Sequence, residues 1–225
     1  MVTLKEIKSY EDESGNTIEF KGLINKEVLV IFKGKNNKLI IEEGFRTAKL
    51  TVYFDCNNAT CIIGKNTFRG AIRIGENCQV TIGDGVTCTE NCFISTAEHA
   101  SVTIGNDCMI ASGNQIRADD AHPIFDVETG KRINMPKSIS IGSHVWIGAR
   151  AIVLGGTTIG DGSIVGLGSI AKGRFPNNCI LVGAPAKIVR KNVAWERPHL
   201  SNTPPYYKPD ASFVKRSEFW NMTEE

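Results

Sequence analysis

Aliphatic residues recur along this chain at a step of six positions. They stand at Ile141, Ile147, Val153, Ile159 and Val165, and the same step joins Ile104, Ile110 and Ile116. A step of six does not fit the 3.6-residue period of an α-helix, in which each of the frequent glycines would also cost about 1 kcal/mol. The pattern therefore predicts short strands joined by tight corners, with one aliphatic side chain of each hexad pointing into a shared core.

Glycines and other small residues occupy the predicted corners. The Ile-Gly pair recurs at positions 63, 74, 82, 104, 141, 147 and 159. A second small residue follows four places after the aliphatic one, as at Cys78, Cys108, Ala151, Thr157, Ser163 and Ser169. Three hexads make one triangular coil, and stacked coils bury one another's faces, so we expect a prism of about six or seven coils.

The repeat is interrupted once and ends before the C-terminus. Ile104 and Ile141 are 37 residues apart, and the excess is a loop at 118–138 that breaks the pattern and contains a histidine. Loops on rigid repeats often carry function. Five of the eight prolines lie beyond Ala184, which marks the end of the repeat. We expect an N-terminal cap at 1–40, a β-helix at 41–190, and a C-terminal cap at 191–225 that has a short helix near 211–220 and packs on the last coil or on a neighbouring subunit.

Composition narrows the class of protein. The 225 residues carry a net charge of only +2, which gives no whole-molecule argument for nucleic acid binding. Seven cysteines without a CxxC pair argue against a disulfide framework and against a zinc site, so no metal is expected. The first fifteen residues do not form a signal peptide, and no apolar stretch is long enough to span a bilayer. We expect a soluble cytoplasmic protein.

Two motifs carry a resemblance to a known family. The segment ISIGSHVWIGARAIVLGGTTIGDGSIVGLGSIAKGRFPNNCILVGAPAKIVRK, residues 139–191, resembles the terminal signature of hexapeptide-repeat O-acetyltransferases. DDAHPI at 119–124, followed by VWIG at 145–148, is similar to the galactoside, maltose and surface-polysaccharide enzymes, and most to capsular polysialic acid O-acetyltransferases. The resemblance covers about residues 60 to 190.

The resemblance implies a fold and an assembly. The fold is an all-β, left-handed parallel β-helix, an exception to the right-handed crossover rule. The assembly is a homotrimer in which acetyl-CoA lies in a groove between two prisms, and the loop of one subunit closes the site on the next. Each active site would then need two chains.

The resemblance also implies the catalytic residues. His122 would act as the general base that deprotonates an acceptor hydroxyl, and Asp119 or Asp120 would orient its ring. Trp146 would line the site beside His122 of the adjoining subunit. Without the resemblance, His122 would be interpreted as a surface-loop histidine and Trp146 as a packing residue; His144 and His99 are expected to be ordinary surface or inter-subunit residues.

The family pattern places donor and acceptor contacts as well. Backbone groups of Ala149 and Leu167 would bind the pantetheine arm, Lys172, Lys187 and Arg190 the phosphates, and Pro185 the adenine. The chain departs from the galactoside and maltose enzymes in lacking an N-terminal helical segment and in having a basic insertion, with Lys137 among its residues. Carboxylates of an acidic polymer could bind Arg117, Lys131, Arg132 and Arg150, although solvated surface charge explains these residues equally well.

The sequence thus predicts an acetyl-CoA-dependent O-acetyltransferase that modifies a bacterial surface saccharide, a capsular sialic acid polymer, by direct transfer in a ternary complex. An amino-sugar N-acetyltransferase or a serine acetyltransferase would share the scaffold and the donor. A γ-type carbonic anhydrase would need three converging histidines on zinc, and the four here lack that spacing. A non-catalytic structural β-helix is the remaining alternative, against which the loop histidine and VWIG argue.

Overall fold

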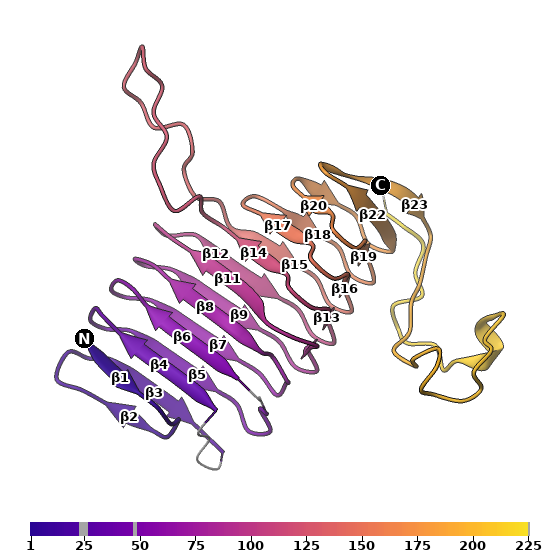
Figure 1. Cartoon of the computed structure of the whole chain (residues 1–225), viewed down its shortest axis with the longest axis horizontal. Coiled ribbons are helices and arrows are strands. Elements are labelled where there is room, and N and C mark those ends of the chain that lie inside the picture. Colours follow the sequence, from indigo (N-terminus) through magenta and orange to yellow (C-terminus); the bar gives the residue numbers. More distant parts are fainter. Residues whose placement is uncertain (23–26, 47–48, 225) are drawn as a thin grey trace.

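A computed structural model describes residues 1–22, 27–46 and 49–224, and these form a three-sided prism of stacked coils (Figure 1). Each side of the prism is a β-sheet to which successive coils contribute one strand. The eight-stranded sheet contains β1 (Val2–Leu4), β4 (Val28–Phe32), β6 (Leu50–Phe54), β8 (Gly70–Ile74), β11 (Cys92–Thr96), β14 (Gln115–Arg117), β17 (Ile152–Leu154) and β20 (Ile170–Ala171).

The other two sides are built in the same way. The nine-stranded sheet contains β2 (Tyr10–Glu11), β3 (Thr17–Phe20), β5 (Lys38–Ile41), β7 (Thr60–Ile63), β9 (Gln79–Ile82), β12 (Ser101–Ile104), β15 (Ile139–Ile141), β18 (Thr158–Ile159) and β21 (Arg174–Phe175). The six-stranded sheet contains β10 (Thr87–Cys88), β13 (Met109–Ile110), β16 (Trp146–Ile147), β19 (Ile164–Val165), β22 (Cys179–Gly183) and β23 (Ala186–Lys191).

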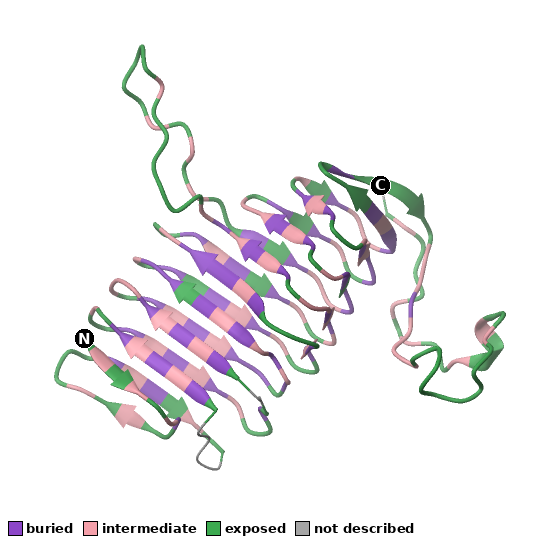
Figure 2. Ribbon diagram, viewed as in Figure 1, coloured by how far each residue is buried: buried purple, intermediate pink, exposed green. Residues whose placement is uncertain are grey.

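The parallel register stacks the predicted hexad positions directly over one another. Ile110 pairs with Ile147, which pairs with Val165, and all three side chains are fully buried. Figure 2 shows buried and partly exposed residues alternating along the strands, as expected when one face of each strand points into the prism. The predicted parallel β-helix is confirmed, and the coils agree with its left-handed form.

Close approach between coils explains the corner glycines. A Cβ built at Gly148 would lie 2.7 Å from the backbone nitrogen of Leu167 in the next coil. Because that contact is with backbone, no side-chain movement could relieve it. The glycine is therefore required by the stacking distance of the coils.

Antiparallel pairs stand at both ends of the stack. β1 pairs with β4 and β2 with β3 at one end, and β22 with β23 at the other. Parallel pairing already begins between β3 and β5, within the region expected to be an N-terminal cap, of which residues 23–26 lie outside the described residues. The division of the chain at residue 40 stays a prediction.

The chain leaves the prism twice. The loop at 118–138 departs between β14 and β15 and projects away from the coils (Figure 1). Beyond β23 the C-terminal segment leaves the last coil, and of the helix expected near 211–220 only a three-residue 3₁₀ helix, η1 (Ala211–Phe213), is present. In the described part of the chain, no helix has the length and apolar character needed to cross a membrane.

The expectation that His144 is an ordinary surface or inter-subunit residue is wrong, because the tail of the same chain buries it. Its side chain is only 2% exposed, because the C-terminal segment folds back over it. The ring stacks between Trp195, at a centroid distance of 4.1 Å, and Phe219, at 4.8 Å. Its Nδ1 lies 2.6 Å from Asp107 Oδ2 and its Nε2 lies 3.0 Å from the Trp195 carbonyl oxygen. The ring therefore contacts both the prism, through Asp107, and the tail, through Trp195, and holds the tail to the prism.

Candidate active site

His122 lies at the base of the projecting loop, in a turn made by its neighbours. Asp119 Oδ1 accepts a hydrogen bond of 2.9 Å from the Ala121 amide, and the His122 amide donates to the Asp120 carbonyl at 2.7 Å. Aspartate favours such turns because its side chain can bond the backbone two residues further on. The turn leaves His122 exposed to solvent.

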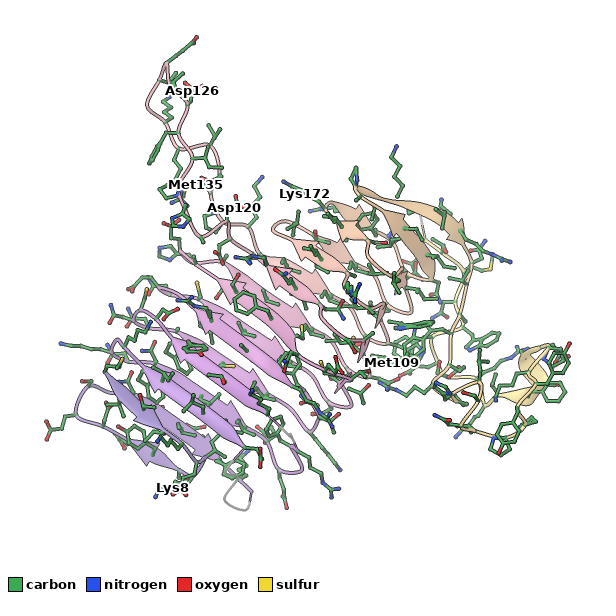
Figure 3. All side chains as sticks on the ribbon, in the orientation of Figure 1. Lys8, Met109, Asp120, Asp126, Met135 and Lys172 are labelled. Carbon is green, nitrogen blue, oxygen red and sulfur yellow. The ribbon has the colours of Figure 1, made fainter. Side chains whose placement is uncertain are left out.

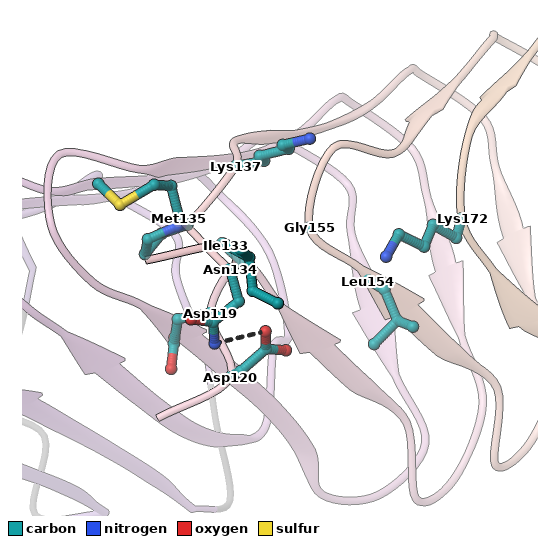
Figure 4. Close-up of a pocket in the computed structure, with 11 residues that line it drawn as sticks. Asp119, Asp120, Ile133, Asn134, Met135, Lys137, Leu154, Gly155 and Lys172 are labelled. Atoms are coloured by element: carbon teal, nitrogen blue, oxygen red, sulfur yellow. Dashed lines mark hydrogen bonds between the residues drawn. The ribbon is translucent and has the colours of Figure 1, made fainter. Parts of the chain in front are cut away.

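Asn134 joins the two arms of the loop at this point. Its Nδ2 donates to Asp120 Oδ2 at 3.0 Å, drawn in Figure 4, and to the His122 carbonyl at 2.9 Å. Its Oδ1 accepts from the Ile124 amide at 2.7 Å. No sequence pattern predicts this role, since Asn134 pairs with residues 10 to 14 positions earlier. Within the described chain, neither Asp119 nor Asp120 bonds the His122 ring, so the orienting role stays a prediction.

A pocket lies between the loop base and the last coils. Asp119, Asp120 and Asn134 line it on the loop side, and Leu154 and Lys172 line it on the side of β17 and β20 (Figure 4). A second pocket lies on the other side of the loop base, over β6, β8, β11 and β14. Asp119 lines both pockets and Ala121 lines the second. The turn that carries His122 therefore lies between these two pockets, over one face of the prism.

The residues assigned to the acetyl donor fall on two different corners. Ala149 and Leu167 follow β16 and β19, at the corner between the six- and eight-stranded sheets, and the Gly168 amide donates to the Ala149 carbonyl at 2.9 Å. Pro185 lies nearby in the turn of the β22–β23 hairpin, because the Gly183 amide donates to Ser169 Oγ on that corner. Lys187 and Arg190 are exposed on β23.

Lys172 does not join that group. It follows β20 at the corner between the eight- and nine-stranded sheets, where the loop departs, and it lines the first pocket. Within one chain, Lys172 is therefore a neighbour of the loop base rather than of Ala149 and Leu167. A phosphate contact by Lys172 stays a prediction.

Trp146 lies on the six-stranded sheet of the prism, rather than at either of these corners. It belongs to β16 and pairs with Met109, which Figure 3 shows at the opposite edge of the prism from Asp120 and Lys172. The indole is 37% exposed, and its ring centroid lies 5.9 Å from that of Trp195 in the tail. One chain thus does not bring Trp146 and His122 together.

The basic residues proposed for the acceptor have different partners. Arg132 is engaged by Glu98, with Nη1 at 2.6 and 2.7 Å from its two carboxylate oxygens. Lys131 and Arg150 are exposed. Arg117 lines the second pocket. Of these four residues, Arg117 alone lines one of the two pockets.

No buried thiol suits nucleophilic chemistry. Burial raises the pKa of Cys108 to about 12, and it also raises the pKa values of Cys61 and Cys92 well above the usual value of a thiol. Thiolate is the reactive form, so these cysteines serve as small core residues. Among the described residues, no group of three or more His, Cys, Asp or Glu side chains is placed to hold a metal ion.

The chain is similar in sequence to known acetyltransferases. The family model described as Bacterial transferase hexapeptide (six repeats) matches residues 138–170. The chain is 41% identical over 136 residues to a Polysialic acid O-acetyltransferase of Escherichia coli O1:K1 / APEC, covering 60% of this chain and 44% of that protein. It is 33% identical over 192 residues to a Polysialic acid O-acetyltransferase of Neisseria meningitidis, covering 83% of this chain and 88% of that one.

Two solved structures have the same fold over most of their length. The polySia specific acetyltransferase NeuO superposes with a TM-score of 0.77 at 39% identity, covering 83% of this chain and 81% of that one. The polysialic acid O-acetyltransferase OatWY superposes with a TM-score of 0.72 at 30% identity, covering 89% and 96%. The chain therefore belongs to the hexapeptide-repeat O-acetyltransferase family.

Proposed function

We propose that this protein transfers the acetyl group of acetyl-CoA to a hydroxyl of a capsular sialic acid polymer, with His122 as the general base. The observation that carries the proposal is the position of His122 on a turn between two hollows of one prism face. The relatives named polysialic acid O-acetyltransferases support the choice of acceptor.

The chemistry needs a base because a sugar hydroxyl is a weak nucleophile near neutral pH. His122 would accept the hydroxyl proton as the oxygen attacks the acetyl carbonyl carbon. The carbon–sulfur bond then breaks, and the imidazolium returns its proton to the departing thiolate. The products are the sugar ester and free CoA, and His122 ends as neutral as it began.

A complete site requires a second copy of the chain in this proposal. His122 and the corner that carries Ala149 and Leu167 lie on different edges of one prism. The loop also presents large apolar side chains to solvent, which favours packing against another subunit. Their exposed fractions are 51% for Ile124, 55% for Phe125, 98% for Val127, 66% for Ile133 and 57% for Met135. A homotrimer, with His122 of one subunit beside Trp146 of the next, would satisfy both observations.

The donor would lie along the corner between the six- and eight-stranded sheets. The amides of Ala149 and Leu167 would bind the pantetheine arm, and Pro185 would contact the adenine. Lys187 and Arg190 on the adjacent hairpin would bind phosphates. No metal is needed for this chemistry. A cytoplasmic location fits the seven free cysteines, since oxidising compartments favour disulfides.

Transfer to a defined acceptor tests the proposal. The full chain is incubated with acetyl-CoA and oligosialic acid, with neutral hexosides and amino sugars as other acceptors, and the acetylated product is measured by mass spectrometry. We expect ester formation on oligosialic acid, and a loss of about 100-fold or more in kcat for His122→Ala.

The matched control is His199→Asn. His199 is an exposed histidine in the tail, and its Nδ1 accepts a hydrogen bond of 3.1 Å from the Ser201 amide, which an asparagine oxygen can replace. Its kcat should equal that of the wild type. Acetylation of amino sugars alone, or full activity of His122→Ala, would refute the proposed acceptor or the proposed base.

A further inference from the structure

The outer face of the eight-stranded sheet carries a row of polar residues beside the His122 turn. The parallel register places Tyr53, Arg73, Ser95 and Arg117 side by side on β6, β8, β11 and β14. Neighbouring strands are about 4.8 Å apart, so Ser95 lies between two arginines one strand away on either side. Arg73, Ser95 and Arg117 all line the second pocket.

Arg73 is fixed in place at the far end of this pocket. Its Nε donates to Asp55 Oδ2 at 2.8 Å, and its guanidinium lies over the Tyr53 ring, 5.9 Å from the centroid. Asp55 also pairs with Lys33, whose Nζ lies 2.6 Å from Oδ1. One carboxylate is thus shared by two cations, which leaves a net positive charge here.

Arg117 has no such carboxylate. Its Nη1 donates to the neutral Gln115 amide at 3.2 Å, and its guanidinium lies over the Phe93 ring, 5.4 Å from the centroid. No ion pair involves Arg117 in the described part of the chain. The ring and the amide hold the guanidinium in place while its charge stays available to a ligand.

Three residues that line the pocket have a buried side-chain oxygen without a partner: Ser95, Thr96 and Asp119. Ser95 is 5% exposed, and its Oγ makes no hydrogen bond. Asp119 Oδ2 is likewise buried and unpaired, although Oδ1 of the same carboxylate bonds the Ala121 amide. Buried polar groups in native proteins almost always have a partner. Here a ligand would supply the missing hydrogen bonds.

The groups together match one kind of ligand. A free guanidinium suits a carboxylate, an unpaired carboxylate oxygen suits a sugar hydroxyl, and the Ser95 hydroxyl can bond either. We propose that Arg73, Ser95, Arg117 and Asp119 form a subsite for one carboxylate-bearing sugar of the acceptor, with its carboxylate on Arg117. The subsite rests on the proposed function and adds to it, because Ala121 lines the same pocket and His122 follows it in the chain.

Ser95→Ala gives the sharpest test. Ser95 Oγ has no partner within the chain, so its removal should leave the melting temperature unchanged or higher. The same change should raise KM for oligosialic acid by about 3- to 10-fold and leave KM for acetyl-CoA unchanged. A lower melting temperature with an unchanged KM for oligosialic acid would assign Ser95 a structural role and would contradict the subsite.

Arg117→Met tests the charge, since methionine keeps the unbranched stem over Phe93. The probes are oligosialic acid and the same oligomer with its carboxylates reduced to alcohols. Wild type should prefer the carboxylated oligomer in kcat/KM, and Arg117→Met should lose about 10- to 100-fold on that oligomer only. Arg117→Lys should recover part of the preference. The control is Arg174→Met, an exposed arginine on β21 of another sheet, which should change neither value.

Calorimetric binding of the two oligomers in the absence of acetyl-CoA separates the two proposals. A wild type that binds only the carboxylated oligomer but does not acetylate it would refute the proposed function and keep the subsite. A wild type that binds and acetylates both oligomers equally would refute the subsite alone. Dissociation of the assembly in Arg117→Met, with the oligomer preference intact, would assign the row to a contact between subunits and would also overturn the subsite.

Discussion

The loop at 118–138 and the C-terminal segment beyond residue 191 both leave the prism, but they are held in different ways. The C-terminal segment returns to the coils, and Trp195 is 7% exposed where it covers His144. Arg197 continues the attachment, with its Nε 2.6 Å from Asp107 Oδ1. The loop is held by polar contacts instead: the Arg132–Glu98 ion pair ties it to the coils, and hydrogen bonds of Asn134 join its two arms to each other.

The difference indicates what each segment is for. Burial of aromatic rings is strongly stabilising, so the attached parts of the tail should stay docked in a single subunit. Exposed apolar residues held by a few polar bonds gain most of their stabilisation from a partner. The tail thus packs on the coils of its own chain. The apolar side chains of the loop are exposed in one subunit, where another subunit could cover them.

The largest effect should come from removing the main anchor of the tail. Trp195→Ala deletes the stacking on His144 and the 2.9 Å hydrogen bond from the indole to the His144 carbonyl. Loss of a large buried aromatic costs about 3–5 kcal/mol. Hydrogen exchange at the amides of residues 193–199 should therefore become faster by about two to three orders of magnitude.

Trp220→Ala is the matched control for the tail. Trp220 is 37% exposed, its indole donates to Glu196 Oε1 at 2.7 Å, and it lies under the Arg216 guanidinium. The exchange rate should rise by about 10-fold at most. Equal effects of the two substitutions would show that Trp195 is not the anchor.

A somewhat smaller effect is expected on assembly when the loop becomes polar. Phe125→Ser removes an apolar side chain that is 55% exposed in the isolated chain. If another subunit covers that ring, the association free energy should weaken by about 2 kcal/mol for each copy. Sedimentation over a range of concentrations would measure the change. Tyr206→Ser, at a tail residue that is 69% exposed, should leave association unchanged, and the reverse ranking would assign the interface to the tail.

Asn134→Ala should loosen the His122 turn without unfolding the prism. The change removes the bonds to Asp120 Oδ2 and to the His122 carbonyl, so the position of the base becomes less defined. We expect kcat to fall by about 10-fold with little change in melting temperature. Asn134→Asp keeps the acceptor for the Ile124 amide but places a carboxylate beside Asp120, and it should lose at least as much activity. A fall in melting temperature that matches the loss of activity would contradict a positioning role.

The regular part of this structure could be predicted because the same physical demand repeats in every coil. A core position needs an aliphatic side chain and a corner needs a small residue, so Ile147 and Gly148 are recognisable by spacing alone. The position of His122 on an extruded loop followed from the break in that spacing. Its role came from the family resemblance and stays a proposal.

Contacts between distant segments could not be predicted in the same way. His144 and Trp195 are 51 residues apart, and no period connects the tail to the coils. His144 lies at the corner between β15 and β16, where the coils alone would leave its side chain exposed. It is buried because Trp195 and Phe219 of the C-terminal segment stack on its ring. Lys172 was grouped with Ala149 and Leu167 by the family pattern, whereas the alternation of corners places it near the loop base.

The smallest effect concerns two exposed aspartates, one in each segment. Hydrogen bonds from the Thr129 side chain and amide lower the pKa of Asp126 below its usual 3.8, and the same kinds of bond from Ser212 lower that of Asp210. A depressed pKa in the folded state means that each turn is stabilised above about pH 4 and loses that contribution as the pH falls through the folded value. The protection factors of the Thr129 and Ser212 amides, which correct for the intrinsic pH dependence of exchange, should therefore fall together in acid, while the protection factors near Trp195 should not respond. Asp126→Asn should abolish the acid response at Thr129 only. A response at Trp195 in step with Ser212 would mean that the outer and the anchored parts of the tail open as one unit. That result would refute the claim that the tail is held more firmly to the prism than the loop is.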